Sequence, residues 1–287
     1  MIDEKFINNF IVGRKMKIRG EKAQVTIFVI LAVVIVGAVI LFFAFTDSGQ
    51  KIIAPLIPGG SGNAGNIEEQ LTNCILEKKN LGGDTLFDSE VNSILKNGGE
   101  KNPKFFYLHQ SIPHKYLCYS ANYYEPCVNQ QPLLVQKVES EIKNSLSPTI
   151  EVCIEELKND LNDAGFDTRN ENLNVSVDIT GENINIKIDY PLKIKEGESV
   201  RSFDKFEIKK ASGAYQLILV ADSIVSFETK YGDSDPVAYM SLYPNTRIEK
   251  LKISDGTTLY KISDRTTMEE MNFATRSYAI PIGYNLK

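Results

Sequence analysis

Four cysteines and two histidines are the residues of this 287-residue chain best suited to covalent or metal chemistry. The cysteines are Cys74, Cys118, Cys127 and Cys153. An even number of cysteines in an exported segment predicts disulfides, and four cysteines allow three pairings. We expect Cys118 to pair with Cys127 across a short loop. We expect Cys74 to pair with Cys153, because each lies on the apolar stripe of an expected helix; four free buried thiols are the alternative.

The histidines, His109 and His114, precede two of the cysteines in the pattern H-x4-H-x3-C-x8-C. This spacing matches no common zinc finger, so we expect no metal and no cofactor. The sequence also has no G-x-S-x-G, no H-E-x-x-H and no glycine-rich phosphate loop. A serine or cysteine nucleophile would need one of the two histidines as its base. We therefore expect a protein that is not an enzyme, with a membrane-tethered hydrolase as an alternative.

Aromatic residues are concentrated between Phe105 and Cys127, around the expected local disulfide. Tyrosine is rigid and amphipathic, and it is favoured in recognition surfaces. The segment is therefore a candidate binding patch; the alternative is that the rings pack beneath an irregular loop. The patch comprises Phe105, Phe106, Tyr107, Tyr116, Tyr119, Tyr123 and Tyr124.

The triplet Asn174-Val-Ser176 is the only N-glycosylation sequon of the chain. A glycan on Asn174 requires an exported, exposed segment. Asn174 is therefore a candidate glycosylation site.

An uncharged apolar run extends from Ala23 to Thr46. It is long enough to cross a bilayer as a helix, so we expect a transmembrane helix over residues 24–46. Residues 1–23 hold six Lys/Arg and three Asp/Glu, and we expect them to form a cytoplasmic basic leader. The C-terminal domain would then lie outside the cell, with the lipid bilayer as a partner.

The junction of the basic and apolar segments resembles a known signal. Lys22-Ala23-Gln24 followed by Val25-Thr26-Ile27-Phe28 is similar to an archaeal class III (prepilin-type) signal. The resemblance implies a surface protein processed between Ala23 and Gln24, with the apolar segment retained. Many type IV pilins carry Glu at the fifth mature position, where this chain has Phe28.

A linker rich in glycine and proline follows the apolar run, over residues 47–66. Pro55 and Pro58 interrupt a helix, whereas pilins typically extend their membrane helix into the head domain. The linker thus favours a tethered domain, and a pilin-like filament subunit is the alternative.

The remainder, residues 67–287, is expected to be an α+β domain, helical over 67–165 and rich in mostly antiparallel sheet over 166–287. Apolar spacing predicts helices from Asn66 and over 89–96, and two further helices separated at Ser147-Pro148. Alternating residues predict a hairpin around Thr180–Asn183. A buried helix over 215–227, a hairpin at Asp255-Gly256 and a late edge strand over 275–282 complete the expectation.

The net charge of the chain is −5, and its first 23 residues carry +3, so the body is acidic. An acidic body disfavours nucleic-acid binding, which needs a basic face. The sequence predicts a single-pass, membrane-anchored cell-surface protein with a binding or structural role. Its partners would be other surface proteins or glycans.

Overall fold

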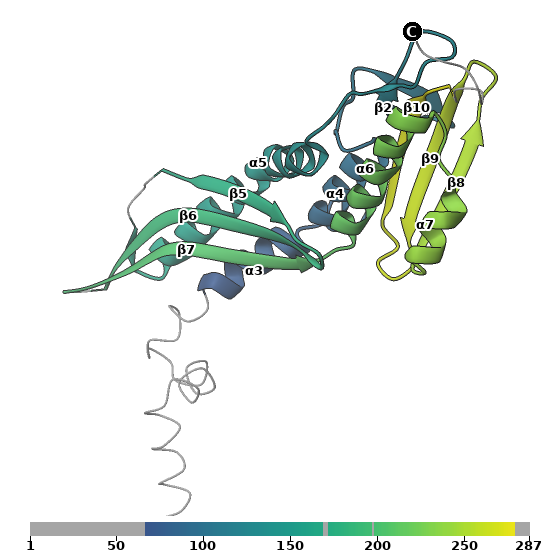
Figure 1. Cartoon of the computed structure of the whole chain (residues 1–287). Helices are drawn as coiled ribbons and strands as arrows, with labels where there is room; N and C mark the ends of the chain where they lie inside the picture. Colours follow the sequence, from purple (N-terminus) through teal and green to yellow (C-terminus); the bar gives the residue numbers. More distant parts are fainter. Residues whose placement is uncertain (1–66, 169–171, 197, 279–287) are drawn as a thin grey trace, which may run out of the picture. The chain divides into compact units, whose positions relative to one another are not determined.

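In the computed structural model, the described residues are 67–168, 172–196 and 198–278. The chain divides into the units Met1–Asn66 and Ile67–Lys287, and only the second contains described residues. Its elements are shown in Figure 1. In chain order they are α3 (Ile67–Glu77), α4 (Leu86–Lys96), β1 (Phe106–His109), β2 (Ile112–Tyr119), β3 (Val128–Asn129), α5 (Leu134–Asp163), β4 (Asp167–Thr168), β5 (Asn174–Ile179), β6 (Asn183–Glu196), β7 (Ser199–Ala211), α6 (Ala214–Tyr231), α7 (Pro236–Leu242), β8 (Thr246–Lys252), β9 (Thr257–Asp264) and β10 (Glu270–Arg276).

The fold class predicted from the sequence requires correction. No helix of the described residues is long and apolar enough to cross a bilayer, and the fold class that these residues support is that of an α+β domain with a mixed sheet. The helix predicted over residues 24–46 lies outside the described residues. So do the proposed processing site, Ala23 and Gln24, and the linker 47–66 on which the filament alternative depends.

The division into a helical part and a later antiparallel part is also wrong. One sheet has the order β1-β2-β10-β9-β8, with β3 paired to β2. Its strands β2 and β10 are parallel and its other pairs are antiparallel, so this sheet is mixed. Because β1 to β3 precede α5, the first part of the chain supplies half of this sheet. The second sheet is antiparallel, with β6 pairing β4, β5 and β7.

Helix α5 runs through the proline that was expected to separate two helices. Pro148 lies inside the 30-residue helix and is exposed. Proline removes one helical hydrogen bond and costs about 3 kcal/mol in a helix interior. The apolar stripe offsets this cost, since Leu146 and Ile150 are both fully buried on either side of the proline. The stripe comprises Leu134, Val138, Ile142, Leu146, Ile150, Ile154, Leu157 and Leu161.

Helix α5 contacts α3, α4, α6 and the edge strand β5. Figure 1 shows it lying along the sheet of β5, β6 and β7, while α4 and α6 lie against β2, β10 and β9. One hydrophobic cluster includes residues of both sheets, among them Ile186 of β6 and Phe273 of β10. The stripe of α5 is therefore part of a single core.

Several local predictions are confirmed. Strands β5 and β6 form the hairpin expected around Thr180–Asn183, with Ile179 opposite Ile184. Helix α6 covers the buried helix expected over 215–227, and Asp255-Gly256 lies in the turn between β8 and β9.

The late strand differs from its prediction. Strand β10 ends at Arg276 and lies between β2 and β9, not at an edge. Its central residues Met271 and Phe273 are buried, which explains the central position. Residues 279–282 of the predicted strand lie outside the described part of the chain.

Replacing the proline inside α5 should stabilise the domain. We expect Pro148→Ala to raise the free energy of unfolding by about 1–3 kcal/mol, because alanine restores an amide donor and relieves the ring clash. The matched control is Asn144→Ala, at an exposed position one turn earlier, with an expected gain of about 0.5 kcal/mol. Chemical denaturation of the two variants measures the difference, and a destabilised Pro148→Ala protein would contradict this account of α5.

Candidate functional site

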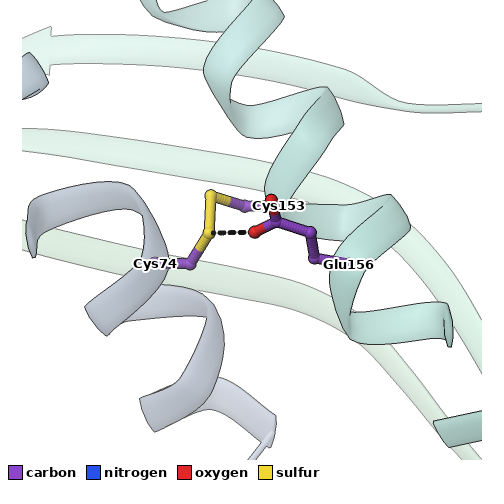
Figure 2. A group of neighbouring side chains, drawn as sticks. All are labelled: Cys74, Cys153 and Glu156. Atoms are coloured by element: carbon purple, nitrogen blue, oxygen red, sulfur yellow. Dashed lines mark hydrogen bonds between the residues drawn. A yellow bond between two sulfur atoms is a disulfide. The ribbon is translucent and has the colours of Figure 1, made fainter. Parts of the chain in front are cut away.

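The four cysteines form two disulfides with the predicted pairing. Cys74 of α3 is bonded to Cys153 of α5, and Cys118 of β2 to Cys127. Figure 2 shows Glu156 beside the first bridge, with its Oε2 3.3 Å from Cys74 Sγ. A disulfide sulfur carries no proton to donate, and Glu156 already accepts from Lys78 at 2.9 Å. This trio is therefore a covalent link with a neighbouring ion pair, and no metal position.

The second cysteine pair removes the sulfur ligands from the zinc pattern. His109 ends β1 and His114 lies near the start of β2, so both are close to the turn of the hairpin, with ring centroids 5.9 Å apart. His114 is buried, and burial lowers its pKa while Nδ1 contacts the Ile112 carbonyl at 3.1 Å. In the described ranges neither histidine has a carboxylate as a hydrogen-bond or ion-pair partner in the structure. The arrangement therefore offers no oriented base for the hydrolase alternative.

The aromatic segment forms strands β1 and β2 and then a loop over residues 120–127 that holds Tyr123 and Tyr124. Three of its rings pack together, with the centroid of Phe105 4.7 Å from that of Tyr116 and 4.9 Å from that of Tyr119. Tyr116 is buried, and its hydroxyl bonds Thr257 Oγ1 at 2.9 Å. These three rings contact one another and form a packed base, of which Phe105 is 46% exposed.

Other members of the predicted patch remain exposed. Tyr123 is 69% exposed, and its ring lies 5.1 Å from that of Tyr278. The guanidinium of Arg276 lies 5.6 Å from the ring centroids of both Tyr119 and Tyr278. Tyr123, Tyr278 and Arg276, together with the packed base, are called the aromatic end of the sheet below.

The C-terminal half of the aromatic end was missed by sequence reasoning. Arg276 and Tyr278 are more than 150 residues from Tyr119, and only the parallel pairing of β2 with β10 brings them together. In that pairing Arg276 lies opposite Tyr119. A parallel pair leaves no local turn signal in the sequence.

Hydrogen bonds to backbone carbonyls hold the side chain of Arg276 in place. Its Nη1 donates to the carbonyls of Ser120 and Ala121 at 2.9 and 3.3 Å, and its Nε to that of Asp255 at 3.1 Å. The salt bridges of the described residues do not include Arg276. The aromatic end therefore carries a positive charge fixed by carbonyl groups.

A hollow of about 200 Å³ adjoins the aromatic end, between the end of α6, the β8–β9 turn and the end of β10. Tyr278 is part of the aromatic end and also lines the hollow. Thr257 lines the hollow too, and its side chain forms a hydrogen bond with the hydroxyl of Tyr116. The hollow is lined by Gly232, Asp233, Lys252, Ile253, Gly256, Thr257, Thr258, Ser277 and Tyr278.

The β8–β9 turn fits against Tyr278 because Gly256 has no side chain. Gly256 has φ of 88°, a left-handed conformation that favours glycine. A Cβ on it would lie 2.3 Å from the hydroxyl oxygen of Tyr278, which donates to the Asp255 carbonyl at 3.1 Å. The glycine thus permits the close approach that forms one wall of the hollow.

The opposite wall carries an ion network centred on Asp233, just after α6. Asp233 accepts from Lys250, and from Lys252 at 2.8 Å. Burial would raise the pKa of Asp233, but the two lysines outweigh burial and lower it. This carboxylate is therefore ionised at neutral pH and paired with two lysines. It cannot act as an acid catalyst there, and we assign it to the wall of the hollow.

A buried acid lies close to this network. Glu228 of α6 is 1% exposed and accepts a hydrogen bond from the hydroxyl of Tyr260. Burial raises the pKa of Glu228, although Thr275 and Tyr260 partly oppose the shift. Neither Glu228 Oε2 nor Thr275 Oγ1 has a hydrogen bond of normal geometry, although the two groups are neighbours. A proton on Oε2 would be donated to Thr275, and burial favours this protonated form, so we assign Glu228 a role in supporting the fold.

A second hollow, of about 720 Å³, lies at the far end of β8, β9 and β10. Its charged residues are already paired, Lys261 with Glu270 at 2.7 Å and Arg247 with Glu249 at 3.2 Å. Among the described residues its lining contains no aromatic ring, so it lacks the stacking faces that adjoin the first hollow.

The sequon lies on the sheet formed by β4 to β7. Asn174 and Ser176 are both exposed near the start of the edge strand β5, while Val175 between them is buried. The geometry leaves the side chain of Asn174 accessible, and its glycosylation stays a prediction.

Neutralising Glu228 permanently should change the pH dependence of stability. A carboxyl whose pKa is raised by folding stabilises the protein fully below its unfolded pKa, and this contribution is lost as pH rises through the folded pKa. Wild type should therefore lose up to about 1.4 kcal/mol per pH unit relative to Glu228→Gln above about pH 4.5, until the folded pKa is passed. Denaturant titrations from pH 4 to 9 measure this difference, with Glu156→Gln as an exposed control on α5. A difference that is constant with pH would show that Glu228 is ionised in the folded protein.

No known relative identifies a ligand for the aromatic end and its hollow. In comparisons with known proteins, no family model, no curated protein and no solved structure matches this chain.

Proposed function

We propose that this protein is a binding protein that works outside the cytoplasm and recognises a saccharide through the aromatic end of its mixed sheet. The observation that carries the proposal is the group of exposed and half-exposed tyrosines beside a small polar hollow. Tyr123 and Tyr278 offer ring faces, and Thr257, Asp233 and Lys252 line the adjoining space.

The chemistry of the aromatic end suits a sugar better than an apolar ligand. Sugar rings pack their C–H faces on aromatic rings and use their hydroxyls as both donors and acceptors. Next to such rings, the hollow is lined by the Asp233–Lys252 ion pair and by the hydroxyls of Thr257 and Thr258. Its volume of about 200 Å³ is below the roughly 300–1,000 Å³ of sites for drug-sized ligands, so one ring of a longer glycan is the fitting size.

The two disulfides support a location outside the cytoplasm. Disulfides persist in oxidising compartments and are rare in the cytosol. Both cysteine pairs of the described domain are bonded, and one of them, Cys118–Cys127, closes the loop that carries Tyr123. This loop is part of the proposed recognition surface, so an oxidising environment would also keep that surface in shape.

Binding should depend on the exposed rings. We expect Tyr123→Ala and Tyr278→Ala each to weaken binding to a responding glycan at least tenfold, because each removes a stacking face. The matched control is Tyr243→Ala. It removes a 41% exposed tyrosine at the end of α7 that is not part of the lining of the hollow. The measurement is a glycan array on the intact chain, followed by titration calorimetry with the best responder.

Three outcomes separate the explanations. Loss of binding in the two variants but not in the control supports the proposal. Absence of any glycan signal, or equal binding by all variants, contradicts it. Capture of a surface protein that depends on Tyr123 would assign the same face to protein recognition and would overturn the saccharide assignment.

A further inference from the structure

Strand β1 is an open edge of the mixed sheet with an apolar side-chain set. Among the described strands, only β2 pairs with it. Its sequence is Phe-Tyr-Leu-His, without a charged residue. Phe106 is 41% exposed and Leu108 is 62% exposed, and both lie on the same face because side chains alternate along a strand.

The opposite edge of the same sheet is protected in the usual way. Strand β8 exposes the charged residues Arg247, Glu249 and Lys252. Charged side chains on an edge discourage pairing with another chain. Of the two edge strands β1 and β8, only β1 lacks charged side chains.

The hairpin fixes which backbone groups of β1 face outward. A two-residue turn at Gln110 and Ser111, with φ of 48° and 64°, makes His109 and Ile112 a hydrogen-bonded pair. Hydrogen-bonded pairs alternate along an antiparallel ladder, so Tyr107 also bonds toward β2. Phe105 does the same, since its carbonyl accepts from the Tyr116 amide at 3.1 Å. The N–H and C=O groups of Phe106 and Leu108 therefore point to the open edge.

We infer that two copies of this chain associate by antiparallel pairing of their β1 strands. A two-fold axis perpendicular to the sheet pairs only residues whose side chains lie on the same face. It must therefore lie midway between the two copies of one residue, on which the pairing is centred. Centred on Tyr107, it pairs Phe106 of each copy with Leu108 of the other. All four outward residues then exchange their backbone hydrogen bonds, and both cross-strand pairs are apolar.

An axis centred on Phe106 is less favourable, because it would pair Leu108 with Lys104, which lies outside the strand. An axis centred on Leu108 is less favourable too. It would pair Phe106 with Gln110, which has a left-handed φ and lies in the turn. Only the central pair would then be regular. The register centred on Tyr107 is therefore the one that the geometry selects, and no like charges meet in it, because β1 has none.

Such a dimer would place two aromatic ends on one side of a continuous sheet. Tyr107 packs against the cluster of Tyr116 and Leu259, on the face that bears the aromatic end. A two-fold axis perpendicular to the sheet keeps this face on the same side in both copies. The dimer does not depend on the proposed saccharide binding, but it would make that binding bivalent.

Cross-linking tests the register. The intact chain carries Tyr107→Cys and is purified without reductant. In this register, residue 107 of one copy lies opposite residue 107 of the other in a non-hydrogen-bonded pair. We therefore expect a disulfide-linked dimer on non-reducing gels. The control is Leu251→Cys, which places a cysteine at an exposed position of β8, and it should stay monomeric on the gel.

Sedimentation velocity tests the association without new cysteines. We expect a concentration-dependent dimer of the wild-type chain, and Leu108→Lys should raise its dissociation constant at least tenfold. The matched control Leu251→Lys on the other edge should leave the constant unchanged. Circular dichroism and mapping of the two native disulfides confirm that each variant is folded. A monomer at all concentrations, a dimer insensitive to Leu108→Lys, or cross-linking only through β8 would each overturn the inference.

Discussion

The apolar stripe of α5 is the constraint on which the rest of the described domain depends. This helix contacts α3, α4, α6 and β5, so the first helices and both sheets are connected through it. The residues of its apolar stripe recur every three or four positions from Leu134 to Leu161, without a break at Pro148. The spacing keeps one face on the core along the whole helix, and burial of that face offsets the proline. The disulfide from Cys153 to Cys74 then fixes α3 against the same face.

The parallel pairing of β2 with β10 has the same importance for the candidate site. It places the end of the chain beside the segment that holds Tyr119 and the second disulfide. Ser277 connects the parts that meet there. Its hydroxyl accepts from the Cys127 amide at 3.0 Å and donates to the carbonyl of the buried Glu228 at 3.2 Å. The disulfide loop, the last strand and α6 are thus held to one another beneath the hollow.

Local features of the fold could be predicted from the sequence, whereas long-range ones could not. The β5–β6 hairpin, the turn at Gly256 and helix α6 each have a signal within about 15 residues. The cysteine pairing could also be predicted, because the stripes around Cys74 and Cys153 identify two faces that pack together. The continuity of α5 had a signal too, since Leu146 and Ile150 keep the four-residue spacing across Pro148. The local rule that proline ends a helix was given more weight than this pattern, although tertiary burial overrides it.

The candidate site illustrates the limit most clearly. The segment from Phe105 to Tyr124 was identified by its composition, yet composition cannot separate rings that pack from rings that remain free. Register decides this, because Tyr116 and Tyr119 share a face with Leu259 and Ala274 of neighbouring strands. Arg276 and Tyr278 had no signal, since a parallel partner is chosen by the tertiary fold.

The exposed part of the aromatic end fits the proposed recognition role better than a role in packing. Phe105, Tyr116 and Tyr119 already form a compact base, and Gly256 lets Tyr278 lie against the β8–β9 turn. Tyr123 adds little to that packing, because it is 69% exposed in a loop closed by Cys118 and Cys127. Holding a large ring at the surface of a cross-linked loop forgoes burial but reduces the entropy that a ligand must overcome on binding. A rigid base with a restrained, exposed ring is therefore the arrangement expected of a preorganised binding surface.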